Sequence, residues 1–337
     1  MRVSDDTLRR RLTRRSLFSG AAAGTLVVTT GGASAQRCPA EPAPRAKGPP
    51  VWLDLDQKDL DDAYDQSVYA FNARTIEERR VFNNEIAQAL LPKPDRIAYG
   101  TAEIEKLDIY RTKRVNAPIL VFIHGGGWRG GRSSQFTVYA EPYVKAGAHF
   151  VVLDFTNVRE TNGDIFPMVA QVRRAVAWIH RNAVSFGGNP NEIYTISRSS
   201  GSHLNGCLVI TEWEKEGLPR DFIKGAVMGR GMYDLKPVRL SIRGSYVKFT
   251  DAMEHELSAM RFIDRIHTPI VLAHGTLETP EFQRQSRDFA LALKAAGKPV
   301  TLIVAKGYNH YEVGETVGHP YAVLGRAAMQ MMKLETV

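Results

Sequence analysis

The stretch that decides the fold reads Ile193-Tyr194-Thr195-Ile196-Ser197-Arg198-Ser199-Ser200-Gly201-Ser202-His203. A run of β-forming residues meets a cluster of small residues, and a helix is predicted to begin near Ser200. This order is typical of a nucleophile elbow, G-x-S-x-G, in which a tight strand-to-helix turn raises a serine above a sheet. Ser197 replaces the first glycine of the pattern, Ser199 occupies the nucleophile position and Gly201 the second glycine. On its own, the stretch also fits a Ser/Gly-rich loop that caps a helix.

A second motif follows the apolar run 118–123 and reads His124-Gly125-Gly126-Gly127-Trp128. Glycines here let backbone N–H groups turn toward a reacting oxygen without obstruction by side chains. The alternative is a phosphate-binding loop, but the chain lacks the Gly-Lys-Ser/Thr sequence of a P-loop. Because the HGGG motif stands 75 residues before Ser199, the two motifs together favour a serine hydrolase over a nucleotide-binding protein.

Composition and charge are those of an ordinary globular protein. The chain has 337 residues, 44% of them hydrophobic, and a net charge of +8. Half of that charge comes from six arginines and two aspartates in residues 1–35, so we expect no nucleic-acid partner. Two cysteines exclude a disulfide scaffold, and a free, buried Cys207 is expected rather than a bridge to Cys38. Without H-E-x-x-H or a Cys/His cluster, we expect neither a metal nor another cofactor.

Residues 1–35 are predicted to be an export signal. An arginine pair, Arg14-Arg15, precedes a stretch of apolar and small residues, and Ala33-Ser34-Ala35 matches a signal-peptidase site. The mature chain is therefore predicted to begin at Gln36. The arginine pair resembles a twin-arginine signal, which implies an exported, periplasmic or secreted bacterial protein. A membrane anchor is the alternative, but the stretch is shorter than the about 20 apolar residues needed, so no stable membrane insertion is expected.

Residues 57–337 are predicted to form one α/β domain with a doubly wound sheet, after a Pro-rich tether at 36–56. Apolar β-rich runs alternate with amphipathic helices, as expected for parallel strands covered on both faces. The expected strands are 118–123, 149–155, 192–196, 225–228, 269–273 and 300–305, and the clearest helices are 167–186 and 280–296. Two helical segments, 57–91 and 236–262, interrupt this alternation and are expected to form a small lid.

These motifs resemble the α/β-hydrolase superfamily, and most of all its hormone-sensitive-lipase and kynurenine-formamidase branch, which shares the HGGxW loop. The resemblance covers roughly residues 60–335. It implies the α/β-hydrolase fold, with helices on both faces of a mostly parallel sheet, and a Ser–acid–His triad in chain order. It also implies an oxyanion hole formed by the backbone N–H groups of Gly126, Gly127 and Ser200.

The other two triad members are sought at strand ends. His310 follows the last expected strand, in the place of the family's histidine. Glu278 follows the strand at 269–273, where the branch has its acid. Glu281 and Asp234 remain alternatives for the acid, although Glu281 would fall in the first turn of a helix, where carboxylates are common. In the predicted mechanism, Ser199 attacks a carbonyl, His310 transfers the proton and Glu278 orients the imidazole.

The substrate pocket is expected to be apolar and to lie under the lid. Its predicted substrate-binding residues are Trp128, Arg230, Met232 and Tyr246, with Met228, Phe249, Met253 and Met260 nearby. Two arginines, Arg198 and Arg230, are expected either to pair with carboxylates such as Asp234 or Glu254 or to anchor an anionic group of the substrate.

We therefore predict a secreted serine hydrolase, a carboxylesterase or amidase that forms an acyl-enzyme. Its expected substrate is a small aromatic ester, amide or carbamate. The alternative is a catalytically inactive hydrolase-fold protein that binds a ligand or another protein. The sequence leaves open whether the protein is a homodimer.

Overall fold

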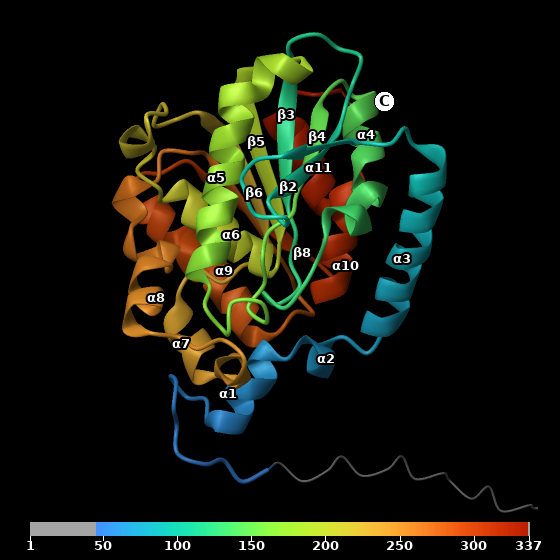
Figure 1. Cartoon of the computed structure of the whole chain (residues 1–337). Coiled ribbons are helices and arrows are strands. Elements are labelled where there is room, and N and C mark those ends of the chain that lie inside the picture. Colours follow the sequence, from blue (N-terminus) through green and yellow to red (C-terminus); the bar gives the residue numbers. More distant parts are fainter. Residues whose placement is uncertain (1–44, 336–337) are drawn as a thin grey trace, which may run out of the picture. The chain divides into compact units, whose positions relative to one another are not determined.

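An eight-stranded, mostly parallel sheet forms the centre of the protein (Figure 1). The computed structural model describes residues 45–335, so the predicted export signal and the start of the predicted tether lie outside the described residues. The strand order is β1-β2-β4-β3-β5-β6-β7-β8, and β2 runs antiparallel to its neighbours. The strands are β1 (Asp95–Ala98), β2 (Lys106–Tyr110), β3 (Ala117–Ile123), β4 (His149–Leu153), β5 (Gly188–Arg198), β6 (Ile223–Gly229), β7 (Ile270–Gly275) and β8 (Val300–Ala305). The predicted α/β-hydrolase fold is confirmed.

The six predicted strands are present as β3 to β8. Strand β8 has the predicted bounds, whereas β5 begins at Gly188 rather than at residue 192. Strands β1 and β2 are additions to the predicted set. They lie at one edge of the sheet and carry charged residues, and Arg96 of β1 donates to Asp108 of β2 (2.8 Å). Because these two short strands carry charges and lack a continuous apolar run, their pattern does not reveal them.

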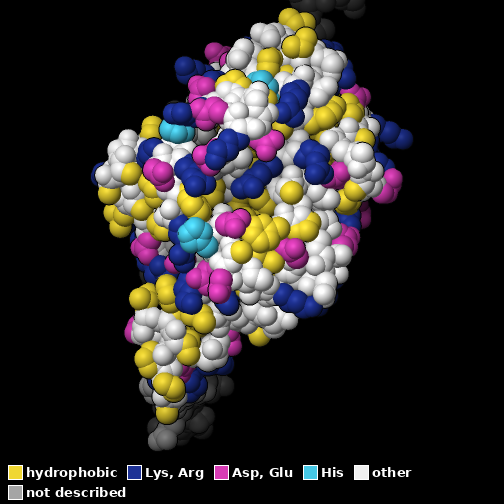
Figure 2. Space-filling view, turned by 60° about the vertical axis from the view of Figure 1, so that its left-hand side comes forward, with side chains coloured by type: hydrophobic (Ala, Val, Ile, Leu, Met, Phe, Trp, Pro, Cys, Tyr) yellow, Lys and Arg dark blue, Asp and Glu magenta, His cyan; other side chains and the backbone are white. Residues whose placement is uncertain are grey.

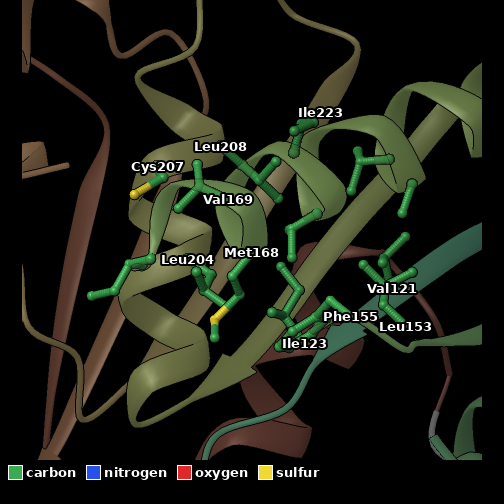
Figure 3. Packing of buried hydrophobic residues seen from close by; sticks show 14 of the residues in the cluster. Val121, Ile123, Leu153, Phe155, Met168, Val169, Leu204, Cys207, Leu208 and Ile223 are labelled. Atoms are coloured by element: carbon green, nitrogen blue, oxygen red, sulfur yellow. The ribbon is translucent and has the colours of Figure 1, made fainter. Parts of the chain in front are cut away.

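Helices cover both faces of the sheet (Figure 1). One face carries α5 (Phe166–Asn182), α6 (Ser200–Val209) and α9 (Pro280–Ala295), and the other carries α4 (Ala140–Lys145) and α11 (Val323–Met331). Alternation along β3 supplies both faces, since Val121 and Ile123 pack with α5 and α6 while Phe122 packs with α4 and α11. Figure 3 shows Met168 of α5 and Leu204 of α6 in this apolar layer. The layer holds α6 firmly against the middle of the sheet.

The predicted lid segments are helical. The first holds α1 (Gln57–Tyr64), α2 (Gln66–Tyr69) and α3 (Ala73–Leu90), and the second holds α7 (Leu235–Leu240) and α8 (Asp251–Glu256). Helices α1, α2 and α7 lie together at the lower end of Figure 1, and α1 contacts α7. The compact unit begins at Lys47, and Trp52 packs against its core, so the end of the predicted tether belongs to this unit. None of the described helices is long and apolar enough to cross a membrane.

Charged side chains of both signs are interspersed on the surface shown in Figure 2. Elsewhere on the described chain, exposed charges pair with near neighbours, as Arg74 does with Glu78 (2.7 Å) and Arg220 with Glu214 (2.7 Å). Such pairs are typical of a solvated surface and contribute little to stability. Inside the protein, Cys207 of α6 is a buried free thiol, as predicted.

Candidate active site

Ser199 lies at the turn between β5 and α6. Its backbone angles are φ 55° and ψ −128°, in a region that side chains other than glycine rarely adopt. This is the strained strand-to-helix turn expected of a nucleophile elbow. Gly201 makes the turn possible, because a Cβ atom there would lie 2.2 Å from the carbonyl oxygen of Ile123. Helix α6 therefore begins directly against the end of β3.

Ser197, the departure from the G-x-S-x-G pattern, is accommodated as a buried polar residue. Its Oγ accepts a hydrogen bond from Asn205 Nδ2 (3.0 Å) and lies 3.0 Å from Ser202 Oγ. Ser202 Oγ in turn donates to the Gly229 carbonyl (2.8 Å). Because these hydroxyl and amide groups satisfy one another, a serine at this position does not leave an unpaired buried group.

The three predicted triad residues meet at the carboxyl ends of β5, β7 and β8. His310 Nε2 lies 3.0 Å from Ser199 Oγ, and His310 Nδ1 is hydrogen-bonded to Glu278 Oε1. The Gly275 N–H donates to the other carboxylate oxygen of Glu278 (3.2 Å). The side chains are buried, with 9% of Ser199, 5% of His310 and 2% of Glu278 exposed. This arrangement provides a continuous path for a proton between hydroxyl and imidazole.

His310 opens a short helix, α10 (His310–Glu315), rather than lying within a loop. Asn309 caps this helix, and its Oδ1 accepts from the N–H groups of Tyr311 (3.0 Å) and Glu312 (3.1 Å). The cap fixes the backbone from which the imidazole projects. The residue that precedes His310 in the sequence, Asn309, thus fixes the position of the histidine.

The alternative acids lie elsewhere. Glu281 Oε2 accepts from the Tyr64 hydroxyl (3.0 Å), and both its oxygens accept from Arg284. Asp234 caps α7 by accepting from the Lys236 N–H (3.1 Å). Among these three carboxylates of the described chain, Glu278 is the one that contacts His310.

The glycine loop packs against the elbow. The Trp128 N–H donates to Ser200 Oγ (3.2 Å), and the Trp128 indole N–H donates to His203 Nδ1 (3.2 Å). Gly126 and Gly127 have positive φ values of 127° and 61° and line the cavity beside Ser199. Within the described residues, their N–H groups donate to no other group. Ser200 is the first residue of α6, so its N–H has no partner within the helix.

The buried side chain of His124 packs against this loop. Its ring stacks on Phe155 (4.2 Å between centroids) and on Phe136 (5.3 Å), and burial lowers its pKa to about 4. The imidazole is therefore neutral, and its ring fills the space between the glycine loop and the two aromatic rings. The loop runs into a 3-10 helix, Ser133–Tyr139, and not into the N-terminus of an α-helix. The glycine spacing 125–127–130 therefore does not form a dinucleotide-binding turn.

A cavity of about 590 Å³ opens onto Ser199 and His310, and both lid segments contribute to it. Its lining differs from the predicted apolar pocket. Arg230 and Tyr246 line it as predicted, but Met232 and Trp128 do not, since both are buried in the main core with 0% and 2% exposed. Met228 and Met253 are likewise core residues. Their side chains pack between the elements instead of into the cavity.

The cavity lining is rich in charge. Four arginines, Arg129, Arg198, Arg230 and Arg243, line it together with the carboxylates Asp65 and Glu77 and the amide of Gln66. Arg198 and Arg230 stand out in the sequence, whereas no motif singles out the other charged and amide residues, most of which come from the lid segments. The expected pairing with Asp234 or Glu254 is wrong. Glu254 accepts from Arg239 (3.1 Å) and Arg261 (3.2 Å), while Arg198 Nη1 lies 3.8 Å from Glu77.

These arginines change the titration of the triad. Burial, followed by the positive charges of Arg230, Arg243 and Arg198, lowers the pKa of His310 well below its usual value. Burial raises the pKa of Glu278 to about 7, and Arg230 and the Gly275 N–H oppose that rise. The imidazole is thus neutral at pH 7, which is the state in which it can accept a proton.

Comparison with known proteins agrees with this architecture. A family model described as BD-FAE matches residues 107–228. Kynurenine formamidase of Danio rerio is 28% identical over 73% of this chain and 83% of its own length. The isoprenylcysteine alpha-carbonyl methylesterase ICME of Arabidopsis thaliana is 26% identical over 64% of this chain and 56% of its own length.

Solved structures are similar in fold. A putative thioesterase from Silicibacter sp. tm1040 has a TM-score of 0.66 at 22% identity, covering 79% of this chain and 97% of its own. The propionate-bound esterase Est2 of Thermogutta terrifontis has a TM-score of 0.61 at 21% identity, covering 72% and 94%. The predicted resemblance is confirmed. The chain has the α/β-hydrolase fold and is similar to esterases and formamidases, and these relatives support hydrolysis of ester or amide bonds.

Proposed function

We propose that the chain is a serine hydrolase that cleaves a carboxylic ester or amide bond of a small molecule through an acyl-enzyme. Ser199 is the nucleophile, His310 the general base and Glu278 the acid of the triad. The observation that carries the proposal is the hydrogen-bonded series from Ser199 Oγ through His310 to Glu278, beginning at a strained elbow.

The chemistry follows from this series. As Ser199 Oγ attacks the carbonyl carbon, its proton passes to His310 Nε2, and Glu278 stabilises the imidazolium that forms. The imidazolium then protonates the leaving alcohol or amine. Water attacks the acyl-enzyme with the same base, which releases the acid and restores the Ser199 hydroxyl.

The oxyanion is proposed to bind the backbone N–H groups of Gly126, Gly127 and Ser200. Support comes from the amides of Gly126 and Gly127, which donate to no group of the described chain, and from the position of Ser200 at the start of α6. The bond from the Trp128 N–H to Ser200 Oγ holds the loop and the elbow together. An aryl group of the substrate would have Tyr64, Tyr246 and Tyr311 available in the cavity.

We also propose that residues 1–35 direct export to the periplasm or beyond and are removed before Gln36. The support is the arginine pair, the apolar stretch and the Ala33-Ser34-Ala35 site in the sequence. The mature enzyme would then act outside the cytoplasm.

Labelling with a fluorophosphonate tests the nucleophile. Mass spectrometry is expected to find the label on Ser199, and Ser199→Ala is expected to lose both the label and about 10⁶-fold in rate. Ser245→Ala is the control, because Ser245 is an exposed serine of the same cavity. Retention of even a tenth of the activity by Ser199→Ala would remove it from this role. A folded wild-type protein that neither takes the label nor hydrolyses 4-nitrophenyl acetate would favour the inactive binding protein.

A further inference from the structure

Arg230 is a buried guanidinium that lines the cavity without a carboxylate partner. Only 1% of the residue is exposed, and its Nε has no hydrogen-bond partner in the part of the chain that the structure describes. Over residues 45–335, its side chain forms neither an ion pair nor a hydrogen bond. Arg284 shows the usual arrangement, with Glu281 and Asp288 both paired to it. A buried charge without a partner is costly, so its retention calls for an explanation.

Backbone conformation and packing both fix the position of the Arg230 guanidinium. Arg230 follows β6 with φ 56°, a strained value for a residue with a side chain, and its N–H donates to the Ala273 carbonyl (2.8 Å). Gly314 of α10 leaves the space, because a Cβ atom there would lie 2.5 Å from Arg230 Nη2 and 3.0 Å from Cζ. A strained backbone, a matching glycine and full burial together place the positive charge at the edge of the cavity.

Neighbouring charges do not neutralise it. Glu77 is the carboxylate nearest to Arg198, at 3.8 Å, and it already accepts two hydrogen bonds from Arg80 (2.8 and 3.0 Å). Glu278 interacts electrostatically with Arg230, but its oxygens are bonded to His310 and to the Gly275 N–H. Positive charge therefore exceeds negative charge around this end of the cavity.

Two further buried groups in the lining are also incompletely bonded. Arg243 is 6% exposed and donates to neutral acceptors, the Tyr246 hydroxyl (2.9 Å) and the Tyr64 carbonyl (3.1 Å), while its Nε has no partner among residues 45–335. Gln66 is 8% exposed, and within the same range both polar atoms of its amide lack partners. Unpaired buried polar groups that converge on one cavity are typical of a site that is completed by a ligand.

We propose that Arg230, together with Arg198 and Arg243, binds a carboxylate of the substrate, so that the enzyme acts on esters or amides of molecules that retain a free carboxylate. The inference rests on the proposed hydrolysis at Ser199 and names its substrate class. Guanidinium groups suit the role because their N–H donors match the two oxygens of a carboxylate. A cavity of about 590 Å³ restricts the substrate to a small molecule.

Two matched pairs of substrates test the proposal. Mono-4-nitrophenyl glutarate and 4-nitrophenyl pentanoate differ in a carboxylate on the acyl side, and 4-carboxyphenyl acetate and 4-methylphenyl acetate differ on the leaving-group side. Wild-type enzyme is expected to favour the anionic member of at least one pair by about tenfold or more in kcat/KM, as charge-assisted hydrogen bonds allow. Arg230→Met is expected to bring that ratio close to one, and Arg230→Lys to retain part of it. Arg326→Met, at an exposed site on α11, is the control and is expected to keep the wild-type ratio.

Equal rates on both members of both pairs, or a preference for the neutral members, would overturn the proposal. A decrease of the same size on anionic and neutral esters in Arg230→Met would also overturn it, since it would leave Arg230 a purely structural role. Thermal unfolding distinguishes these cases further. Replacing an unpaired buried charge by methionine is not expected to lower Tm, whereas loss of a structural ion pair would lower it.

Ligand binding separates failure of this inference from failure of the proposed function. Benzoate and its neutral analogue benzamide are titrated calorimetrically into wild-type, Ser199→Ala and Arg230→Met proteins. Tighter binding of benzoate that depends on Arg230 is expected even in Ser199→Ala, which cannot react. If no ester is hydrolysed but this binding is found, the proposed hydrolysis fails and the anion site stands. If esters are hydrolysed but benzoate binds no better than benzamide, the anion site fails.

Discussion

Gly201→Ala is expected to disturb the nucleophile elbow without altering a catalytic side chain. An added methyl group would lie 2.2 Å from the carbonyl oxygen of Ile123 and 2.5 Å from that of His124. A carbon atom approaches a carbonyl oxygen to about 3.3 Å, so the start of α6 and the end of β3 would have to separate by about 1 Å. Both oxygens belong to the backbone, and no change of side-chain rotamer relieves the contact.

The separation acts directly on the reacting groups. Ser199 stands two residues before Gly201, and the oxygens that would be displaced belong to β3 and the glycine loop. A displacement of about 1 Å in a reacting group can lower a rate about 100-fold, and we expect that loss in kcat/KM. Overpacking destabilises by about 1–3 kcal/mol, and the better helix propensity of alanine offsets at most about 1 kcal/mol of this. With the full offset, a net loss of about 0–2 kcal/mol in the free energy of unfolding follows.

Gly206→Ala is the matched control. Gly206 lies in the same helix, but its added methyl group would meet the Ala259 Cβ at 3.3 Å and the Tyr233 ring at 3.5 Å, so a shift of a few tenths of an ångström relieves the contact. Initial rates with 4-nitrophenyl acetate and thermal unfolding are measured for both variants. The control is expected to stay near wild type in both. A Gly201→Ala enzyme within about threefold of wild type, with unchanged Tm, would refute the packing argument for the elbow.

Three further outcomes are expected. Glu278→Gln should lower kcat by about 10⁴ with little change in Tm, whereas Glu281→Gln should lower Tm and leave the folded enzyme active; the reverse result would show that Glu278 is not the acid. Protonation of His310 should limit activity only below pH 6.5, the ordinary pKa of histidine, because burial and nearby arginines lower the His310 pKa. Removing a positive charge raises that pKa, so in Arg230→Met the acid limb of the pH–rate profile should move to higher pH, and an unmoved limb would count against the charge effect. Mass spectrometry of protein exported by the native host should find Gln36 at the N-terminus, and a chain that keeps residues 1–35 would contradict the export signal.

Most of the sheet was predictable because its strands are apolar runs. The run at 300–305 and the five other apolar runs all correspond to strands, with shifts of a few residues at their ends, and this includes the partly exposed edge strand β8. Strands β1 and β2 escape prediction because both are short and interrupted by charged residues. Strand β1 is an exposed edge strand, whereas β2 is buried between β1 and β4, where Asp108 accepts from Arg96. Local apolar patterning thus misses a strand that carries charge, even where that strand is buried.

The meeting of the three proposed triad residues was predictable for a different reason. Ser199, Glu278 and His310 each follow a strand, and parallel strands bring their carboxyl ends to one edge whatever lies between them. No comparable rule predicts from the sequence which side chains line the cavity. Met232 and Arg243 both come from segments of irregular pattern, and only the packing of the lid decides that the methionine enters the core and the arginine lines the cavity. Side-chain direction in short helices and turns depends on tertiary contacts that no local period encodes.

The arginines around His310 act in opposite ways on two parts of the proposed reaction. By lowering the pKa of the imidazole they keep it neutral, but they also disfavour the imidazolium that forms when it takes the proton of Ser199. A substrate carboxylate held among these arginines would offset their charge at the moment the imidazolium forms. A neutral ester would leave the imidazolium beside three arginines, of which only Arg198 lies within 4 Å of a carboxylate of the described chain, Glu77. The preference proposed for anionic substrates is therefore expected in kcat as well as in KM, because the substrate's charge assists the base in addition to anchoring the molecule.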